Sequence, residues 1–193
     1  MPKIVDHEKR KAKIAKATWQ VILKHGMKGA SVRNIAREAN LSLGALRHYF
    51  PNQDELYAYA MQLVSERVKK RLKNVVQSDL PPKEKVIAFL EEFLPLDEES
   101  SKEMEVWFHF MYHYFDQGED INDGIRDAVR LVFAFLEKEN LLLEGLDKDL
   151  EIERLYAIID GLALHKIIGK NSLSNKMMQR VLTSHIESLI KND

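Results

Sequence analysis

The chain has 193 residues, and its 29 Lys and Arg against 30 Asp and Glu give a formal net charge of −1. It has no cysteine, which excludes disulfides, thiolate metal sites and a cysteine nucleophile. The first residues are charged rather than apolar, and no run reaches the roughly 18 apolar residues of a membrane span. We therefore expect a soluble, cytoplasmic protein with no membrane partner.

The charge is distributed unevenly along the chain. Residues 1–50 hold eleven basic and three acidic residues, a net charge of +8, and the remainder carries −9. A polyanion would be attracted to one end of the molecule and repelled by the other. This asymmetry favours a nucleic acid as the partner.

The first predicted helix runs from about Asp6 to His25, with an apolar stripe that includes Ile14 and Val21, and Gly26 is expected to end it. The basic residues around this stripe either touch phosphates or form an ordinary solvated face.

Residues 30–56 predict a helix-turn-helix and the start of a longer helix. Ser31 and Ser42 can each cap a short helix, and Pro51 ends the second one. The second helix carries small residues at its start and basic or hydrogen-bonding residues at its end, which suits a recognition helix in the DNA major groove. The apolar positions that face inward are Val32, Ile35, Ala36, Ala39, Leu46 and Phe50.

The outward residues of this motif divide into two groups of expected contacts with a double-stranded DNA operator. Arg47 could reach a guanine edge instead of a phosphate. The expected base contacts are Ser42, Leu43, Gly44, Ala45 and His48, and the expected phosphate contacts are Ser31, Arg33, Arg47, Tyr49 and Gln53.

A second pattern in the same stretch consists of Ala36, Asn40 to Ser42, Gly44 to Leu46, Tyr49, Phe50, Asn52 and Asp54 to Leu56. In these residues the chain resembles the tetracycline-repressor (TetR) family of bacterial regulators. Arg47 stands where that family usually has Tyr, and Gln53 where it usually has a phosphate-contacting Lys. The resemblance implies a repressor that senses a small molecule.

The remaining pattern is helical throughout, so we expect an all-α protein of about nine helices. Residues 1–52 would form the DNA-binding domain and residues 53–193 a ligand-binding and dimerisation domain. After a long helix from Asn52 to about Val76, the expected helices cover residues 86–94, 101–117, 120–139, 148–169 and 174–190. We expect a loop at the acidic residues before residue 101, from Asp97 onward, and another loop at 141–147.

The helix predicted at 101–117 is apolar nearly all round, so we expect it to be largely buried. Its aromatic rings either fill a core or line an apolar pocket for an unidentified small-molecule effector. The candidate ligand-binding residues are Phe89, Phe93, Trp107, Met111, Tyr112, Phe133 and Tyr156.

Glu105, His109, His113 and Asp116 form one polar column on this helix. A metal-dependent enzyme using these four residues is the alternative function, whereas a solvated strip is the simpler interpretation, which we favour. No phosphate-binding glycine loop or nucleophile motif supports an enzyme, so we expect no catalytic residue, metal or cofactor. A helical adaptor protein would leave the basic first fifty residues unexplained.

The last two predicted helices have apolar residues on two sides, which indicates a partner helix pair. Two chains could form a four-helix bundle as a homodimer, although both sides could also pack inside one monomer. The candidate interface residues are Tyr156, Ile159, Leu162, Ala163, Met178, Val181, Leu182 and His185. The sequence favours a homodimeric DNA-binding regulator that reads a palindromic operator. The resemblance to the TetR family implies in addition that it is a repressor and that it responds to a ligand.

Overall fold

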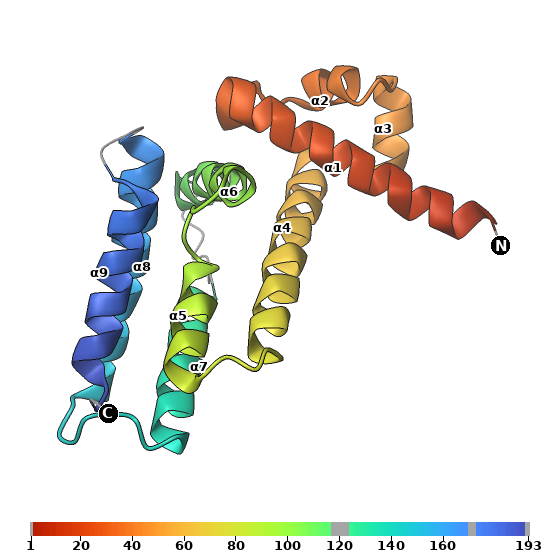
Figure 1. Ribbon diagram of the computed structural model, residues 1–193. Coiled ribbons are helices and arrows are strands. Elements are labelled where there is room, and N and C mark those ends of the chain that lie inside the picture. Colours follow the sequence, from red (N-terminus) through yellow and green to blue (C-terminus); the bar gives the residue numbers. More distant parts are fainter. Residues whose placement is uncertain (1, 117–123, 170–172, 192–193) are drawn as a thin grey trace. The chain divides into compact units, whose positions relative to one another are not determined.

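The computed structural model describes residues 2–116, 124–169 and 173–191, and it confirms the expected all-α fold. These residues form nine helices, and none of the described helices is long and apolar enough to cross a membrane. The helices are α1 (Pro2–Gly29), α2 (Val32–Glu38), α3 (Leu43–Tyr49), α4 (Gln53–Val76), α5 (Pro82–Glu91), α6 (Glu98–Asp116), α7 (Ile125–Lys138), α8 (Lys148–Ile168) and α9 (Asn175–Leu189) (Figure 1).

The chain divides into two compact units. One contains Met1–Arg67 and Glu105–Ile121, and the other contains Val68–Met104 and Asn122–Asp193. Helices α4 and α6 therefore contribute to both units. We predicted a boundary at residue 52 between a DNA-binding domain and a ligand-binding domain. The two compact units are divided at other positions, and the functional boundary stays a prediction.

In the first unit, α1 packs on α2, and α2 packs on α3. The Trp19 indole N–H of α1 donates a hydrogen bond of 3.2 Å to the carbonyl oxygen of Ala60 in α4. The Arg67 guanidinium lies 4.6 Å from the centre of the Trp19 ring. The regular part of α1 ends at Gly26, as expected. Gly26 has a φ of 65°, which is not helical and which residues with a Cβ atom rarely adopt.

In the second unit, α5, α7, α8 and α9 form a bundle in which each helix contacts two of the others. Its core includes Leu90, Val129, Leu155 and Met178, one from each helix. The end of α9 is fixed to the loop before α8, where Leu142 and Ile190 form an isolated antiparallel bridge. Figure 1 shows α8 and α9 side by side.

An ion-pair network joins the later part of α4 to α6 within the second unit. The Arg71 guanidinium contacts Glu92 Oε2 at 2.6 Å and Glu103 Oε2 at 3.0 Å. Glu103 is buried, with 5% of its side chain exposed. A buried carboxylate needs such a cation, so Arg71 holds these elements together.

Helix α6 begins at Glu98, three residues before the predicted start, because residues 97–100 form a cap rather than a loop. The Ser100 N–H donates to Asp97 Oδ1 at 2.8 Å, and the Asp97 N–H donates to Ser100 Oγ at 3.0 Å. The hydrogen bond from the Ser100 backbone lowers the pKa of the Asp97 carboxyl. The acidic residues that we assigned to a loop instead occupy the positive end of the helix dipole. Residues 117 and 120–123, which we also expected to be helical, lie outside the described residues.

Candidate DNA-binding interface

Helix α2 begins at the predicted cap. The Asn34 N–H donates to Ser31 Oγ at 3.3 Å, while Ser31 itself has extended backbone angles. The apolar residues Ile35 and Ala36 face the core, whereas Arg33 is exposed. The predicted orientation of α2 is therefore confirmed.

The turn between α2 and α3 is closed by backbone hydrogen bonds around Asn40. Asn40 has a φ of 55°, the left-handed conformation that asparagine tolerates better than most residues. The Asn40 N–H donates to the Arg37 carbonyl at 3.1 Å, and the Leu41 N–H donates to the Ala36 carbonyl at 2.9 Å. This pair of bonds is a Schellman motif that ends α2, and four residues separate α2 from the start of α3.

Helix α3 presents one side to the core and the other to solvent. The Ala45 N–H donates to Ser42 Oγ at 3.1 Å, which confirms the second cap. Leu46 and Phe50 are buried and hold the helix in place. Among the predicted DNA contacts, Ser42, Gly44, Arg47 and His48 are exposed, and Leu43, Ala45 and Tyr49 are half-buried.

The start of α4 is fixed to the motif by a second kind of cap. Asn52 Oδ1 accepts a hydrogen bond of 2.8 Å from the Glu55 N–H, and its amide donates to Glu55 Oε1 at 2.7 Å. The Gln53 amide donates to the Ala30 carbonyl at 3.3 Å and also contacts the Tyr57 hydroxyl. Gln53 therefore has partners inside the protein, and its assignment as a phosphate contact remains a prediction.

The compact unit that contains the helix-turn-helix also carries exposed cations. Lys9, Lys13, Lys16, Lys28 and Arg33 are all exposed in the same compact unit as α3. Lys24 is also exposed but pairs with Glu38 at 3.2 Å. Two capped helices with a small, exposed recognition surface, in a unit rich in exposed cations, have the geometry and the charge of a helix-turn-helix that binds DNA.

Comparison with known proteins agrees with this geometry. Residues 14–60 match the family model for bacterial regulatory proteins of the tetR family, and residues 82–191 match the model for the C-terminal part of BetI-type transcriptional repressors. The chain belongs to the TetR family of transcriptional regulators.

Relatives of this TetR-family chain include regulators matched over nearly their full lengths. The HTH-type transcriptional regulator PksA of Bacillus subtilis (strain 168) is 51% identical over 196 residues, covering 100% of this chain and 96% of PksA. The HTH-type transcriptional regulator BetI of Proteus mirabilis (strain HI4320) is 29% identical, covering 97% of this chain and 94% of BetI.

Solved structures share the fold. A transcriptional regulator from Rhodococcus sp. RHA1 superposes with a TM-score of 0.73 at 26% identity, covering 93% of this chain and 95% of that one. A regulator from Saccharomonospora viridis, solved in complex with choline, has a TM-score of 0.80 at 20% identity and covers 96% and 100% of the two chains.

The seven candidate ligand-binding residues of this TetR-family protein belong to both compact units. Phe133 is buried in the core of the second unit, and Phe89, Phe93 and Tyr156 pack against that core. The Arg126 guanidinium lies 4.8 Å from the centre of the Tyr156 ring. Trp107, Met111 and Tyr112 belong to the first unit.

The expectation that the aromatic helix is largely buried is wrong. In α6, Val106 is buried, but Tyr112 is 71% exposed and Phe115 is 77% exposed. Trp107 and Phe110 stack on each other at 6.0 Å between ring centres. Sequence periodicity could not show this, because aromatic residues on all sides of a helix mark either burial or a surface that a ligand or partner covers.

The polar column of α6 does not form a metal site. Among the residues that the structure describes, no group of three or more His, Cys, Asp and Glu side chains could hold a metal ion. The His113 ring instead packs edge-on against Tyr57 and Tyr114, at 5.9 and 5.3 Å between ring centres. Glu105 and His109 are half-buried and Asp116 is exposed. The alternative of a metal-dependent enzyme loses the site on which it rested.

The candidate dimer residues occupy two different environments. Most of them are buried within the single chain, where they pack in its core, and their assignment to a dimer interface stays a prediction. Val181 is 37% exposed, and Tyr156 and His185 are partly accessible. The buried ones are Ile159, Leu162, Ala163, Met178 and Leu182.

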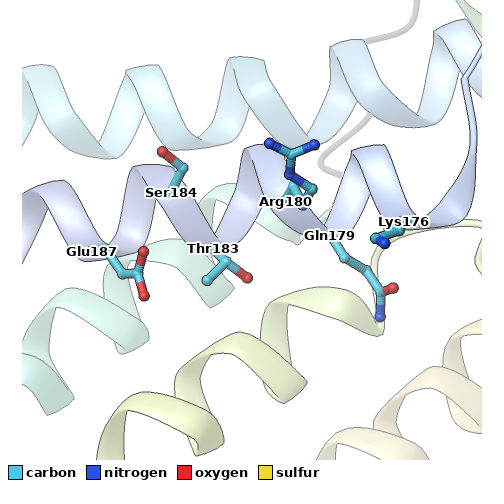
Figure 2. A pocket seen from close by; sticks show the side chains of 6 residues that line it. All are labelled: Lys176, Gln179, Arg180, Thr183, Ser184 and Glu187. Atoms are coloured by element: carbon cyan, nitrogen blue, oxygen red, sulfur yellow. The ribbon is translucent and has the colours of Figure 1, made fainter.

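A polar pocket of about 400 Å³ lies along the surface of α9, and Figure 2 shows its side chains. Hydrogen bonds link α9 to α5, from Gln179 to Glu91 at 2.9 Å and from Lys83 to Glu187 at 2.6 Å. None of the seven candidate ligand residues lines this pocket. Its lining residues are Lys176, Gln179, Arg180, Thr183, Ser184 and Glu187.

Sequence reasoning missed two structural features of the DNA-binding unit. Tyr57 is buried and bonds to the Ala30 carbonyl, and His7 lies against the rings of His48 and Tyr49. Both contacts span long sequence separations. Tyr57 had a weak signal in its apolar position on α4, whereas nothing in the local pattern indicated the partner of His7.

Proposed function

We propose that this TetR-family regulator is a homodimeric repressor that binds a palindromic operator and is released by a small effector. The observation that carries the proposal is the orientation of α3, in which Leu46 and Phe50 face the core while Arg47 and His48 face solvent. A recognition helix must have one side packed in the core and another side exposed, because only exposed side chains can reach the base edges.

Dimer formation is supported by apolar side chains that the monomer leaves exposed on its last two helices. Leu164 and Ile168 of α8 are 40% and 71% exposed, and Met177 and Val181 of α9 are 43% and 37% exposed. Leu164 and Ile168 lie in the C-terminal part of α8, and Met177 and Val181 lie in the N-terminal half of α9. A two-fold dimer through this surface would present two recognition helices to half-sites about 34 to 36 Å apart, or a multiple of that spacing, on one DNA.

The proposed effector is a small apolar or amphipathic molecule, with an organic cation as the first class to test. The exposed and half-buried aromatic rings of α6 are suited to such a ligand, because aromatic faces attract quaternary ammonium groups. The Saccharomonospora viridis regulator of similar fold was solved with choline. Among the candidate residues, Trp107, Met111 and Tyr112 of α6 carry this proposal.

Selection of genomic DNA fragments by the purified full chain tests the operator part of this proposal. We expect the bound fragments to share a palindromic site, and the protein to protect that site from cleavage. Fragments with no common sequence, bound no better than random DNA, would contradict sequence-specific regulation. A reporter placed downstream of the site distinguishes repression from activation.

Fluorescence tests the effector part. The Trp19→Phe variant leaves Trp107 as the single tryptophan, so its emission reports on α6. We expect a member of a panel that includes choline and longer quaternary amines to change this emission and weaken operator binding. Because coupling is reciprocal, operator DNA must lower the affinity of the protein for that ligand by the same factor, typically about 5- to 150-fold. A ligand that changed the emission without changing DNA affinity would contradict the proposed release.

A further inference from the structure

The N-terminal part of α1 contacts the recognition helix through His7. Its ring centre lies 4.8 Å from that of Tyr49 and 6.4 Å from that of His48, and the last two rings are 5.4 Å apart. The three rings therefore form one cluster, which joins the start of the chain to the last turn of α3. Residues 7–13, which we call the arm, precede the segment matched by the tetR family model.

Three further contacts attach the arm next to His7. The Tyr59 hydroxyl donates to Glu8 Oε2 at 3.4 Å, and Lys11 Nζ lies 5.6 Å from the centre of the Tyr59 ring. Lys11 Nζ also lies 5.9 Å from the Phe50 ring centre, beside the end of α3. The arm is thus attached to both α3 and α4, and His7 is not an isolated contact of a free chain end.

The last turn of α3 is the part of the recognition helix that most needs such support. The helix has seven residues and ends where Phe50 becomes extended before Pro51. His48 is exposed, and Tyr49 is half-buried. An aromatic side chain at the end of a short helix can occupy several rotamers in solution. Packing against a neighbouring ring reduces the number of rotamers that it occupies.

We infer that His7 is a positioning residue for DNA binding, which holds the rings of Tyr49 and His48 in the orientation that meets the DNA. This inference rests on the proposed roles of Tyr49 and His48 as DNA contacts. His7 acts through its ring rather than through its own contact with a phosphate. The arm is consequently part of the DNA-binding surface, although it lies outside the helix-turn-helix.

Substitutions that place either an aromatic ring or a positive charge at position 7 test this role in the full-length protein. We expect His7→Ala to weaken operator binding about three- to tenfold, the effect of losing an aromatic pair. His7→Phe should retain nearly all of the affinity, because it keeps the ring packing. His7→Lys should bind as poorly as His7→Ala at physiological salt. Retention of affinity by His7→Lys together with its loss in His7→Phe would show a direct phosphate contact and would overturn the inference.

A double-mutant cycle with Tyr49→Ala separates positioning from a general structural role. If His7 acts through Tyr49, His7→Ala should cost much less affinity in the Tyr49→Ala background than in the unmodified protein. Equal losses in both backgrounds would overturn the inference, and so would equal affinities of all His7 variants and the unmodified protein. The melting temperature of His7→Ala should stay close to that of the unmodified protein. Tyr49→Ala tested alone reports on the proposed contact itself: unchanged operator binding would contradict the proposed contact and the inference together.

Discussion

The Tyr57 hydroxyl donates a hydrogen bond of 2.8 Å to the carbonyl oxygen of Ala30, and both residues are buried. Ala30 directly precedes Ser31, the cap of α2, while Tyr57 lies in the first turns of α4. This bond fixes the start of the helix-turn-helix to the helix that follows it. Burial raises the pKa of the Tyr57 hydroxyl, so the group stays protonated and able to donate.

Tyr57→Phe should lower the free energy of unfolding by about 1 kcal/mol, the net contribution of a typical hydrogen bond. The remaining bond from Gln53 to the Ala30 carbonyl limits the loss. Urea denaturation followed by circular dichroism measures the change. Tyr112→Phe is a matched control, because this tyrosine is 71% exposed and its hydroxyl should contribute little. Equal stability of the two variants would argue against a structural role for the Tyr57 bond.

Arg71→Met should destabilise the protein by about 3 kcal/mol, since it removes the cation that faces the buried Glu103 carboxylate. Lys148→Ala removes a cation from an exposed ion pair with Glu137 and should have little effect. Both variants can be compared by urea denaturation at neutral pH. A loss for Arg71→Met no larger than that for Lys148→Ala would show that the network is unimportant for stability.

The pair of His185 and Glu151, whose side chains are only 11% and 9% exposed, should make stability depend on pH. Their Nε2 and Oε2 atoms are 3.9 Å apart, and neither forms a hydrogen bond within the described part of the chain. Burial lowers the pKa of His185, more than the nearby Glu151 carboxylate raises it. The unfolded chain therefore takes up this proton first as the pH falls, so the His185 contribution to folding is lost below about pH 6.5, the ordinary value for histidine.

Urea denaturation at a series of pH values between about 5 and 8 tests this dependence. His185→Phe should flatten the acid-side loss of stability. Glu151→Gln should extend the loss to lower pH, because it removes the charge that favours protonated His185. A rise in stability as the pH falls, abolished by His185→Phe, would contradict the direction of the pKa shift.

The proposed dimer can be tested at Val181, which is 37% exposed on α9, against Ile159, which is fully buried on α8. Val181→Asp should give a folded monomer, whereas Ile159→Asp should unfold the chain because it buries a charge in the core. Analytical ultracentrifugation and circular dichroism distinguish these results. A monomer for the unmodified protein at micromolar concentration would rule out the proposed assembly.

The helices and the DNA-binding motif could be predicted because helix caps and apolar spacing involve residues that are close together in the sequence. Ser31 and Ser42 each accept a hydrogen bond from the backbone N–H three residues later in the chain. The buried residues Leu46 and Phe50 are four residues apart, which is a helical spacing. The cap at Asp97 was missed because acidic residues were assigned to a loop, although they also favour a helix start.

The distribution of the candidate sites was harder to predict. Ile159 and Leu182 are apolar, and periodicity alone does not distinguish a monomer core from a dimer interface. The partner of His7 is more than forty residues away in the chain, at the end of α3. Contacts of this kind depend on the packing of whole helices, which a single sequence does not specify at the level of individual side chains.

The most direct test of the central claim is the salt dependence of operator binding by the full chain and by Arg47→Ala. Exposed Arg47 lies on α3, and each phosphate contact that it makes should release about one counterion. We expect affinity to fall steeply with salt, and Arg47→Ala to reduce the logarithmic slope by about 1. An operator affinity that does not change with salt would contradict DNA recognition through α3. The same conclusion would follow if the variant that combines Arg47→Ala and Tyr49→Ala bound the operator as tightly as the unmodified protein.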